Sequence, residues 1–368
     1  MSHHRLRILA ADVEHRFVSL ATLIIVWSIS TPLAAQWLKE PTRGMPRTAD
    51  GKPDLSAPAP RAADGNPDLS GLWRMDAGAY GGNVLVDLKP SEIQPWADAL
   101  YKQRMEDLGK DDPSTFKCLP QGPRALYGAG GWARIIQTPI VIAILNENLS
   151  HRQIFLDGRE LPRDPHPSFM GYSVGRWEND TLVVESIGFK DTTWLDFGGH
   201  PHTEELRVVE RYRRTAFGHI ELKQTFEDPK VFSRPVTIDV KVDFVPDTEM
   251  LEYVCNENER DHARLVGKAS DDKKNAVKVA QEVLARYVGA YEFRTPEDPN
   301  QIIVVNVTLV GDEVMLDVGG KDPQPMIPLS ETLFSTSGGR LEFVPDDKGQ
   351  VTHAIFRIVE GDLTGVRK

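Results

Sequence analysis

The sequence predicts an all-β protein with two barrel-like units. From residue 133 to residue 255 the chain is a series of short β-branched runs separated by Pro, Gly, Asn and Asp, and a similar series fills residues 288–368. In places apolar and polar residues alternate, so that Ile220, Leu222 and Phe226 share one face of a strand. Short alternating strands with frequent turns are typical of antiparallel sandwiches and barrels.

The main unit is expected to contain one short helix and enough strands to close a barrel. The helix runs from Ser91, a good N-cap, to Leu108, with Trp96 and Leu100 near helical spacing. After a first strand near Trp73, the predicted strands are 133–138, 140–146, 152–156, 172–177, 182–187, 206–213, 218–226, 236–244 and 250–255. Roughly ten strands are enough to close a barrel that holds one ligand.

The chain divides into five predicted segments. They are a signal peptide over 1–35, an extended Pro/Gly-rich leader over 36–70, the main barrel over 71–268, a linker helix over 269–287 and a smaller β-barrel over 288–368. The leader contains a near-duplicate, in which residues 49–56 resemble residues 63–70. Two copies are too short for a repeat array, and their prolines favour an extended chain.

The N-terminus predicts export. Arg5, Arg7 and Arg16 precede an apolar run over 17–29, and small residues follow in Pro32-Leu33-Ala34-Ala35. This order is typical of a secretory signal peptide, and the run is short for a membrane span. We expect a periplasmic or secreted protein without stable membrane insertion after cleavage; an uncleaved anchor is the alternative.

Net charge and cysteine content limit the classes of partner and the cellular compartment that we expect. The formal net charge is −11, so no basic surface is expected and a nucleic-acid partner is excluded. The two cysteines, Cys118 and Cys255, could form a disulfide in an oxidising compartment, or remain apart.

One long run resembles a known group of proteins. The motifs Cys118-Leu119-Pro120, Asp157-Gly158-Arg159 and residues 175–184 resemble secreted bacterial lipocalin-like β-barrel proteins of largely uncharacterised function. Gly71-Leu72-Trp73 is similar to the G-x-W start of the first lipocalin strand, and the C-terminal unit looks like the small β-barrel appended to β-lactamase-like hydrolases. The resemblance implies fold more than function.

Residues 171–211 gather the side chains most suited to chemistry. Acid–base catalysis near neutral pH favours histidine, so His200 or His202 is the predicted base, oriented by Asp191. Arg159 or Arg211 is the predicted partner for a developing anion. The alternative is structural: Asp157-Gly158 as a hairpin turn, and charged residues paired across strands.

Ligand-binding and metal-binding residues are predicted in the same region. Trp177, Trp194 and Tyr172 are candidates for lining an aromatic pocket, and Arg124 for reaching its mouth from a stiff loop. Tryptophans also fill barrels for packing alone, and such an arginine often ties a loop to a carboxylate. A weaker alternative is a metal site made by His200, His202 and Glu204, which share one face if that stretch is extended.

These features lead to a functional hypothesis. We expect an exported barrel that holds a small apolar or aromatic molecule and performs cofactor-free acid–base chemistry of the lyase, isomerase, hydratase or hydrolase type. The alternatives are a non-catalytic small-ligand carrier of the cell envelope and an interaction module with a filled barrel.

Overall fold

The computed structural model describes residues 40–129, 131–255, 269–294, 302–320, 323–336, 339–347, 349–358 and 361–368. The predicted signal peptide, 1–35, lies outside these residues. Contacts divide the chain into two units: Met1–Thr42 with Asp247–Glu249, and Arg43–Pro246 with Met250–Lys368. In the first unit the Thr42 amide donates to Asp247 Oδ1 at 3.0 Å. No described helix is both long enough and apolar enough to cross a membrane.

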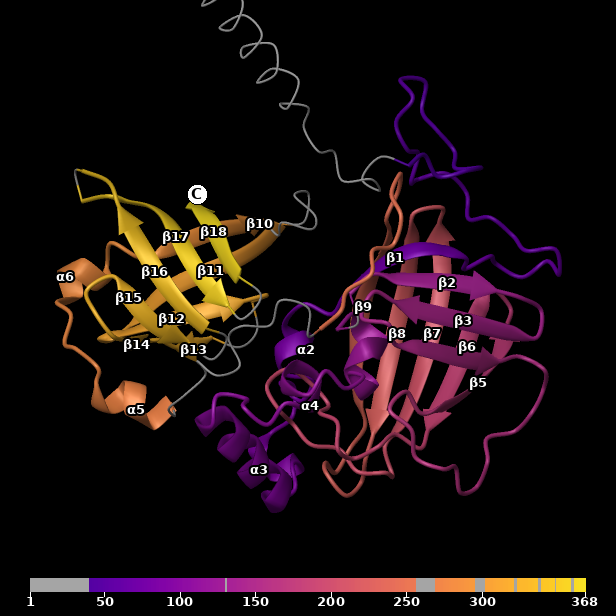
Figure 1. The fold of residues 1–368 in the computed structure, drawn as a ribbon, viewed down its shortest axis with the longest axis horizontal. Coiled ribbons are helices and arrows are strands. Elements are labelled where there is room, and N and C mark those ends of the chain that lie inside the picture. The colour runs from indigo at the N-terminus through magenta and orange to yellow at the C-terminus, as the bar shows by residue number, and fades with distance from the viewer. Residues whose placement is uncertain are drawn as a thin grey trace, which may run out of the picture. The chain divides into compact units, whose positions relative to one another are not determined.

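The second unit contains a closed barrel of nine strands in sequence order (Figure 1). Its strands are β1 (Gly71–Asp76), β2 (Ala133–Gln137), β3 (Val141–Asn146), β4 (His151–Phe155), β5 (Tyr172–Glu178), β6 (Thr181–Ile187), β7 (Arg207–Ala216), β8 (His219–Glu227) and β9 (Val236–Phe244). Neighbours are antiparallel except β4 and β5, which run parallel with Ile154 opposite Ser173. β1 closes the barrel against β9, with Trp73 opposite Phe244. The predicted all-β barrel fold is confirmed.

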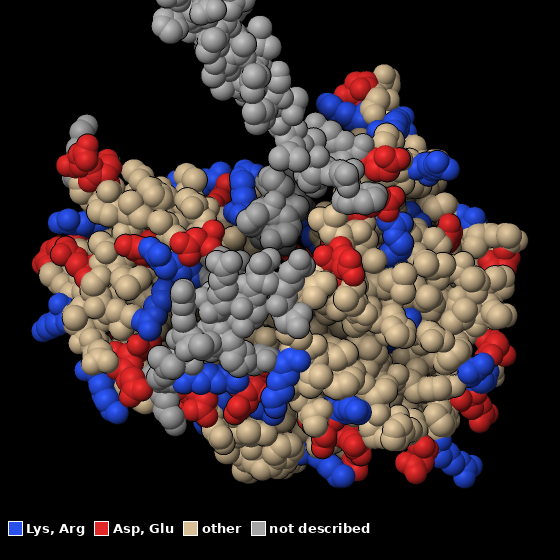
Figure 2. Space-filling model, in the orientation of Figure 1, with Lys and Arg blue, Asp and Glu red and all other residues tan. Residues whose placement is uncertain are grey.

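The alternating residues explain why these strands form a barrel wall. On β8, Ile220, Leu222 and Phe226 are buried, whereas Glu221 and Lys223 are exposed. β9 repeats the pattern without interruption, so that its apolar side chains face the core and its charged ones face solvent. On the face drawn in Figure 2, basic and acidic side chains lie interspersed over the described surface.

Two elements near the barrel differ from the prediction. The helix is shorter: a 3₁₀ turn, Pro90–Glu92, precedes α3 (Pro95–Glu106), because Pro95 fits the first helical position and interrupts the turn before it. Trp96 is 46% exposed. The predicted strand 250–255 is not a strand; its described backbone contact is the Tyr253 amide with the Glu147 carbonyl at 2.8 Å. Other short helical segments are α2 (Ala79–Gly82), α4 (Pro113–Phe116) and the 3₁₀ segment η2 (Gly122–Tyr127).

The described part of the leader is folded against the barrel. Each near-duplicate forms the same turn, in which Arg47 Nη1 donates to the Gly51 carbonyl at 3.0 Å and Arg61 Nη1 to the Gly65 carbonyl at 2.8 Å. Between the two turns, the Leu55 carbonyl accepts the amide of Gly218 in the β7–β8 turn at 2.9 Å. Leu69, after the second turn, is buried in the core. Residues 43–70 therefore pack over one end of the barrel.

The second sheet, formed by residues 289–367, is nearly closed and has nine strands in the order β13-β12-β11-β10-β18-β17-β16-β15-β14. Its strands are β10 (Gly289–Arg294), β11 (Ile302–Val310), β12 (Glu313–Val318), β13 (Gln324–Pro325), β14 (Ile327–Pro328), β15 (Leu333–Thr336), β16 (Gly339–Pro345), β17 (Val351–Ile358) and β18 (Gly361–Arg367). Its core contains a stacked aromatic pair, Tyr287 and Phe343, with ring centroids 4.3 Å apart.

The predicted linker helix is two short helices, α5 (Ala269–Lys274) and α6 (Gln281–Leu284). The chain between them leaves the helical path because the Val277 amide donates to the carbonyl of Pro328, next to β15, at 3.0 Å.

Candidate active site at the end of the main barrel

The loop over residues 188–206 joins β6 to β7 and closes the barrel end opposite the β7–β8 turn. Within it, Trp194 pairs with Pro201, and the Leu195 amide donates to the His200 carbonyl at 2.8 Å. Asp196 lies at the tip of this 194–201 loop, fully buried, and its Oδ1 accepts the amides of Gly199 at 2.9 Å and His200 at 3.0 Å. The carboxylate therefore fixes the loop that carries the first candidate histidine.

Asp196 also orients the His200 ring. Its Oδ2 lies 2.6 Å from His200 Nδ1 and accepts the Val84 amide at 3.0 Å. Because this fully hydrogen-bonded carboxylate is an acceptor, Nδ1 carries the proton and the lone pair lies on Nε2. Tyr101 of α3 stacks on the imidazole with ring centroids 3.8 Å apart. His200 is only 3% exposed, yet Nε2 has no hydrogen-bond partner among the described residues and is not a fully buried atom.

Arg104, one turn after Tyr101 on α3, contacts the same loop. Its Nη1 donates to the Gly199 carbonyl at 2.8 Å, and its guanidinium lies 4.7 Å from the Trp194 ring centroid. Burial lowers the pKa of Arg104, although nearby Asp112 and Asp196 act in the opposite direction. Within the described chain Arg104 forms no ion pair, and its Nε and Nη2 have no hydrogen-bond partner and are not fully buried.

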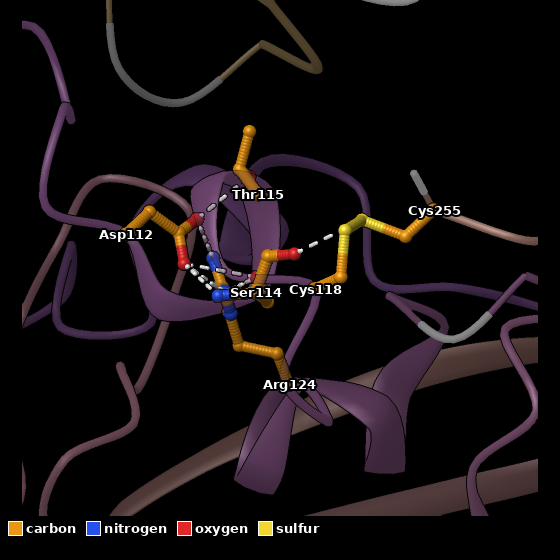
Figure 3. The surroundings of a disulfide bond; sticks show 6 residues. All are labelled: Asp112, Ser114, Thr115, Cys118, Arg124 and Cys255. Carbon is orange, nitrogen blue, oxygen red and sulfur yellow. Dashed lines mark hydrogen bonds and ion pairs between the residues drawn. A yellow bond between two sulfur atoms is a disulfide. The ribbon is translucent and has the colours of Figure 1, made fainter. Parts of the chain in front are cut away.

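A second arginine near the loop, Arg124, is bound by Asp112 (Figure 3). Two hydrogen bonds, at 3.0 and 2.8 Å, join the guanidinium to the carboxylate, which also caps α4 through the Ser114 amide at 2.9 Å. Burial raises the pKa of Asp112, but the hydrogen bonds and charge of Arg124, together with the bonds from Ser114, outweigh it, and the pKa lies below its usual value. Arg124 is fully buried and lies 4.9 Å from the Phe197 ring centroid, and its bonds to Asp112 match the alternative of an arginine that ties a loop to a carboxylate.

The two cysteines are bonded directly beside this pair. Cys118 and Cys255, 137 positions apart, have their sulfur atoms 2.14 Å apart, and Cys255 Sγ lies 3.6 Å from the Ser114 carbonyl oxygen (Figure 3). The disulfide fixes the segment that follows β9 to the segment that carries Asp112.

His202 occupies a different environment from His200. Its Nδ1 donates to the Thr203 carbonyl at 3.1 Å, and its Nε2 lies 2.7 Å from Thr193 Oγ1. Burial lowers the pKa of His202 to about 4, so the ring is neutral at neutral pH and both nitrogens are occupied. Of the two predicted bases, only His200 has a nitrogen available to a ligand.

The predicted metal alternative is not formed. In the described part of the chain there is no group of three or more His, Cys, Asp or Glu side chains that could hold a metal ion. His200 Nδ1 is directed at Asp196, and His202 is bound between two threonines, so the two rings do not converge with Glu204. The stretch is a loop, and the alternation assumed for an extended strand does not apply.

The two arginines predicted as anion partners lie elsewhere. Arg211 alternates with inward-facing Glu210 on β7; it is exposed and donates to Glu178 of β5 at 3.0 Å. Arg159 is exposed beside Asp157, with Nε to Oδ1 at 2.8 Å, and donates to the Tyr172 hydroxyl at 3.1 Å. The structure thus does not bring these arginines to the histidine loop.

The remaining predicted residues lie at separate positions and do not form one group. Trp177 packs against the main core from β5, whereas Trp194 is buried within the 194–201 loop. Asp191 is exposed, and its charge acts on His202, where it raises the pKa against the larger effect of burial. Asp196, and not Asp191, orients the histidine.

Inside the barrel a separate polar group occupies inward positions of β4 to β8. Arg152 Nε donates to Ser173 at 3.0 Å, Nη2 donates to Ser186 at 2.7 Å, and Nη1 and Nη2 both contact Glu210. The Tyr212 hydroxyl donates to Glu210 Oε1 at 2.8 Å, and burial raises the pKa of Tyr212 well above its usual value. These side chains fill the interior where the sequence predicted a ligand.

Sequence reasoning missed the partners of His200. Asp196 stands four residues before it, and Tyr101 and Arg104 lie three apart on the predicted helix, a spacing that places them on one helical face. That face was a recognisable signal, but nothing in the sequence indicated that it meets the 194–201 loop. Comparisons with protein-family models and with curated proteins each found no match for this chain.

Proposed function

We propose that the protein is an exported enzyme that performs cofactor-free acid–base chemistry on a small molecule, with His200 as the base. The observation that supports this most directly is the Asp196–His200 pair, at 2.6 Å, with Nε2 unpartnered among the described residues. A buried carboxylate that holds the imidazole in one tautomer is the arrangement that general-base histidines use. Proton transfer by a positioned group contributes about 10²–10⁴-fold to a rate.

The surroundings favour a small, partly apolar substrate. Phe197, 53% exposed, lies next to Asp196 in the loop, and the Tyr101 ring covers one face of His200. Aromatic rings beside a polar reacting group bind apolar bodies and orient them. Some lyase, isomerase, hydratase and hydrolase reactions proceed by a proton transfer of this kind without a resident cofactor.

Export and a lipocalin-like ancestry are part of the proposal. The basic and apolar N-terminal pattern supports a signal peptide, and the Cys118–Cys255 bond fits an oxidising compartment such as the periplasm. The closed barrel that begins at Gly71-Leu72-Trp73 supports the likeness to lipocalins. Intact mass of protein from a periplasmic fraction tests both: a chain starting at Gln36, two mass units below the reduced form, is expected.

Substitution of His200 tests the catalytic role. The protein is incubated with a small-molecule extract of the host cell, and the compounds it consumes are followed by mass spectrometry. We expect His200→Gln to consume them at least 100-fold more slowly, because glutamine cannot take up the proton. His151→Gln, an exposed substitution on β4, is the matched control and should retain full activity. Equal rates for His200→Gln and the wild type, or no compound consumed by the wild type, would refute the enzyme.

A carrier is the second candidate. Arg104 has two unpartnered guanidinium nitrogens within the described chain, which suffice to bind a polar group without any proton transfer. A carrier would retain a ligand from the extract in native mass spectrometry and leave it chemically unchanged.

A further inference from the structure

We propose that the molecule bound at this site is a small carboxylate and that Arg104 binds its carboxylate group. This inference rests on the proposed function, since it places the ligand next to His200. It depends on a different residue and is tested separately.

The carboxylates of Asp112 and Asp196 are both engaged by other groups. Arg124 is neutralised by Asp112 through two hydrogen bonds, and Asp196 is bound to His200 and three backbone amides. Arg104 is left as the cation without a carboxylate within ion-pair distance among the described residues. Its unused N–H groups can form charge-assisted hydrogen bonds to an incoming anion.

The geometry of Arg104 selects a carboxylate. Nη1 is already used by the Gly199 carbonyl, which leaves Nε and Nη2. These two nitrogens form one edge of the planar guanidinium, and their parallel N–H groups match the two oxygens of a carboxylate. Neither nitrogen is fully buried, so the edge is accessible to a ligand.

Two connections place Arg104 close to the loop that carries His200. Arg104 contacts the carbonyl of Gly199, the residue before His200. Tyr101 stacks on the His200 ring and lies three residues before Arg104 on α3, where side chains at this spacing are neighbours. A small carboxylate held by Arg104 would therefore lie beside the 194–201 loop, which carries both His200 and the exposed Phe197.

Benzoate is a suitable probe because it combines a carboxylate with an apolar ring. We would titrate the full-length exported protein with benzoate, with benzamide as its neutral counterpart and with inorganic phosphate, and follow the Arg104 Nε–H signal by NMR. Saturable binding of benzoate is expected, with affinity at least tenfold above that of benzamide and phosphate and with a shift of the Arg104 signal.

Variants separate the inference from the proposed function. Arg104→Gln should lose at least tenfold in benzoate affinity, while Arg104→Lys, which keeps the charge and a donor to Gly199, should lose less. Arg213→Gln, an exposed substitution on β7, should bind benzoate like the wild type. His200→Gln should still bind benzoate even though it loses turnover.

Several outcomes would overturn the inference alone. They are wild-type affinity in Arg104→Gln, equal binding of benzoate and benzamide, binding of phosphate as tight as that of benzoate, and benzoate binding that leaves the Arg104 signal unchanged. Unaltered turnover in His200→Gln would instead refute the enzyme and leave carboxylate binding by Arg104 intact. If Arg104→Gln did not fold, the wild-type NMR titration and Arg104→Lys would still decide the question.

Discussion

The main barrel buries charged side chains both inside its wall and at the end closed by the 188–206 loop. Inside, every nitrogen of the Arg152 guanidinium donates to a serine or to Glu210. At the end, His200 and Arg104 each retain nitrogens without a partner in the described chain. A network whose donors are all used holds a structure together, whereas unused donors and acceptors that are not fully buried are available to a ligand.

The largest loss of stability is expected from removing the disulfide, which lies beside the cluster at the barrel end and not beside the interior group. Replacing both cysteines, Cys118→Ala with Cys255→Ala, opens a loop of 137 positions and should lower the free energy of unfolding by at most about 5 kcal/mol. Urea unfolding measures the loss. If the unfolding midpoint did not move, the bond would not contribute to holding the Asp112 segment.

The interior group should be essential for stability and irrelevant for chemistry. Glu210→Ala leaves Arg152 charged and buried without its partner, at a cost of about 3–5 kcal/mol. Replacing both, Arg152→Met with Glu210→Leu, should cost less, because no unpaired charge remains. Turnover of folded protein should be unchanged in the double variant; a loss of activity there would mean that the interior group takes part in the reaction.

Acid should destabilise the folded protein through His202. Burial lowers the pKa of His202 from 6.5 to about 4, so the unfolded chain binds a proton that the folded protein does not. Stability should therefore fall as pH drops from about 6.5 to about 4, by about 3 kcal/mol from this residue. Unfolding at several pH values, compared with His202→Gln, measures this contribution. An identical pH dependence in the two proteins would contradict it.

The smallest effect is expected on the outer surface. Arg211→Ala removes an exposed ion pair with Glu178, and solvent screens such pairs strongly. Its unfolding midpoint and its turnover should both match the wild type. A strong loss of turnover would return Arg211 to the role in anion stabilisation that the sequence suggested.

Alternation and turn residues were sufficient to predict the nine strands of the main barrel, because burial of one face follows directly from the period-two pattern. The parallel pairing of β4 with β5 was not predictable, since nothing in either strand encodes the direction of its neighbour. Met250–Cys255 has the composition of a strand but finds no partner strand in the described chain.

The candidate site was predictable in part. His200 and His202 were predicted as bases from their residue type, and His200 keeps this role in the proposal. Which carboxylate orients it could not be decided, because Asp191 and Asp196 are both near in sequence and only the loop closed by Trp194 and Pro201 selects Asp196. Arg104 was hidden because its contact with Gly199 joins residues 95 positions apart.

The position of the disulfide has a consequence for biogenesis. Cys118 leaves the ribosome before β2, and Cys255 follows only after β9, so the bond cannot form until every strand of the main barrel has been synthesised. With only two cysteines in the chain, no incorrect bond can form within one molecule. A barrel that fails to assemble would instead offer a lone Cys118 to other chains, and covalent dimers on a non-reducing gel would report the failure.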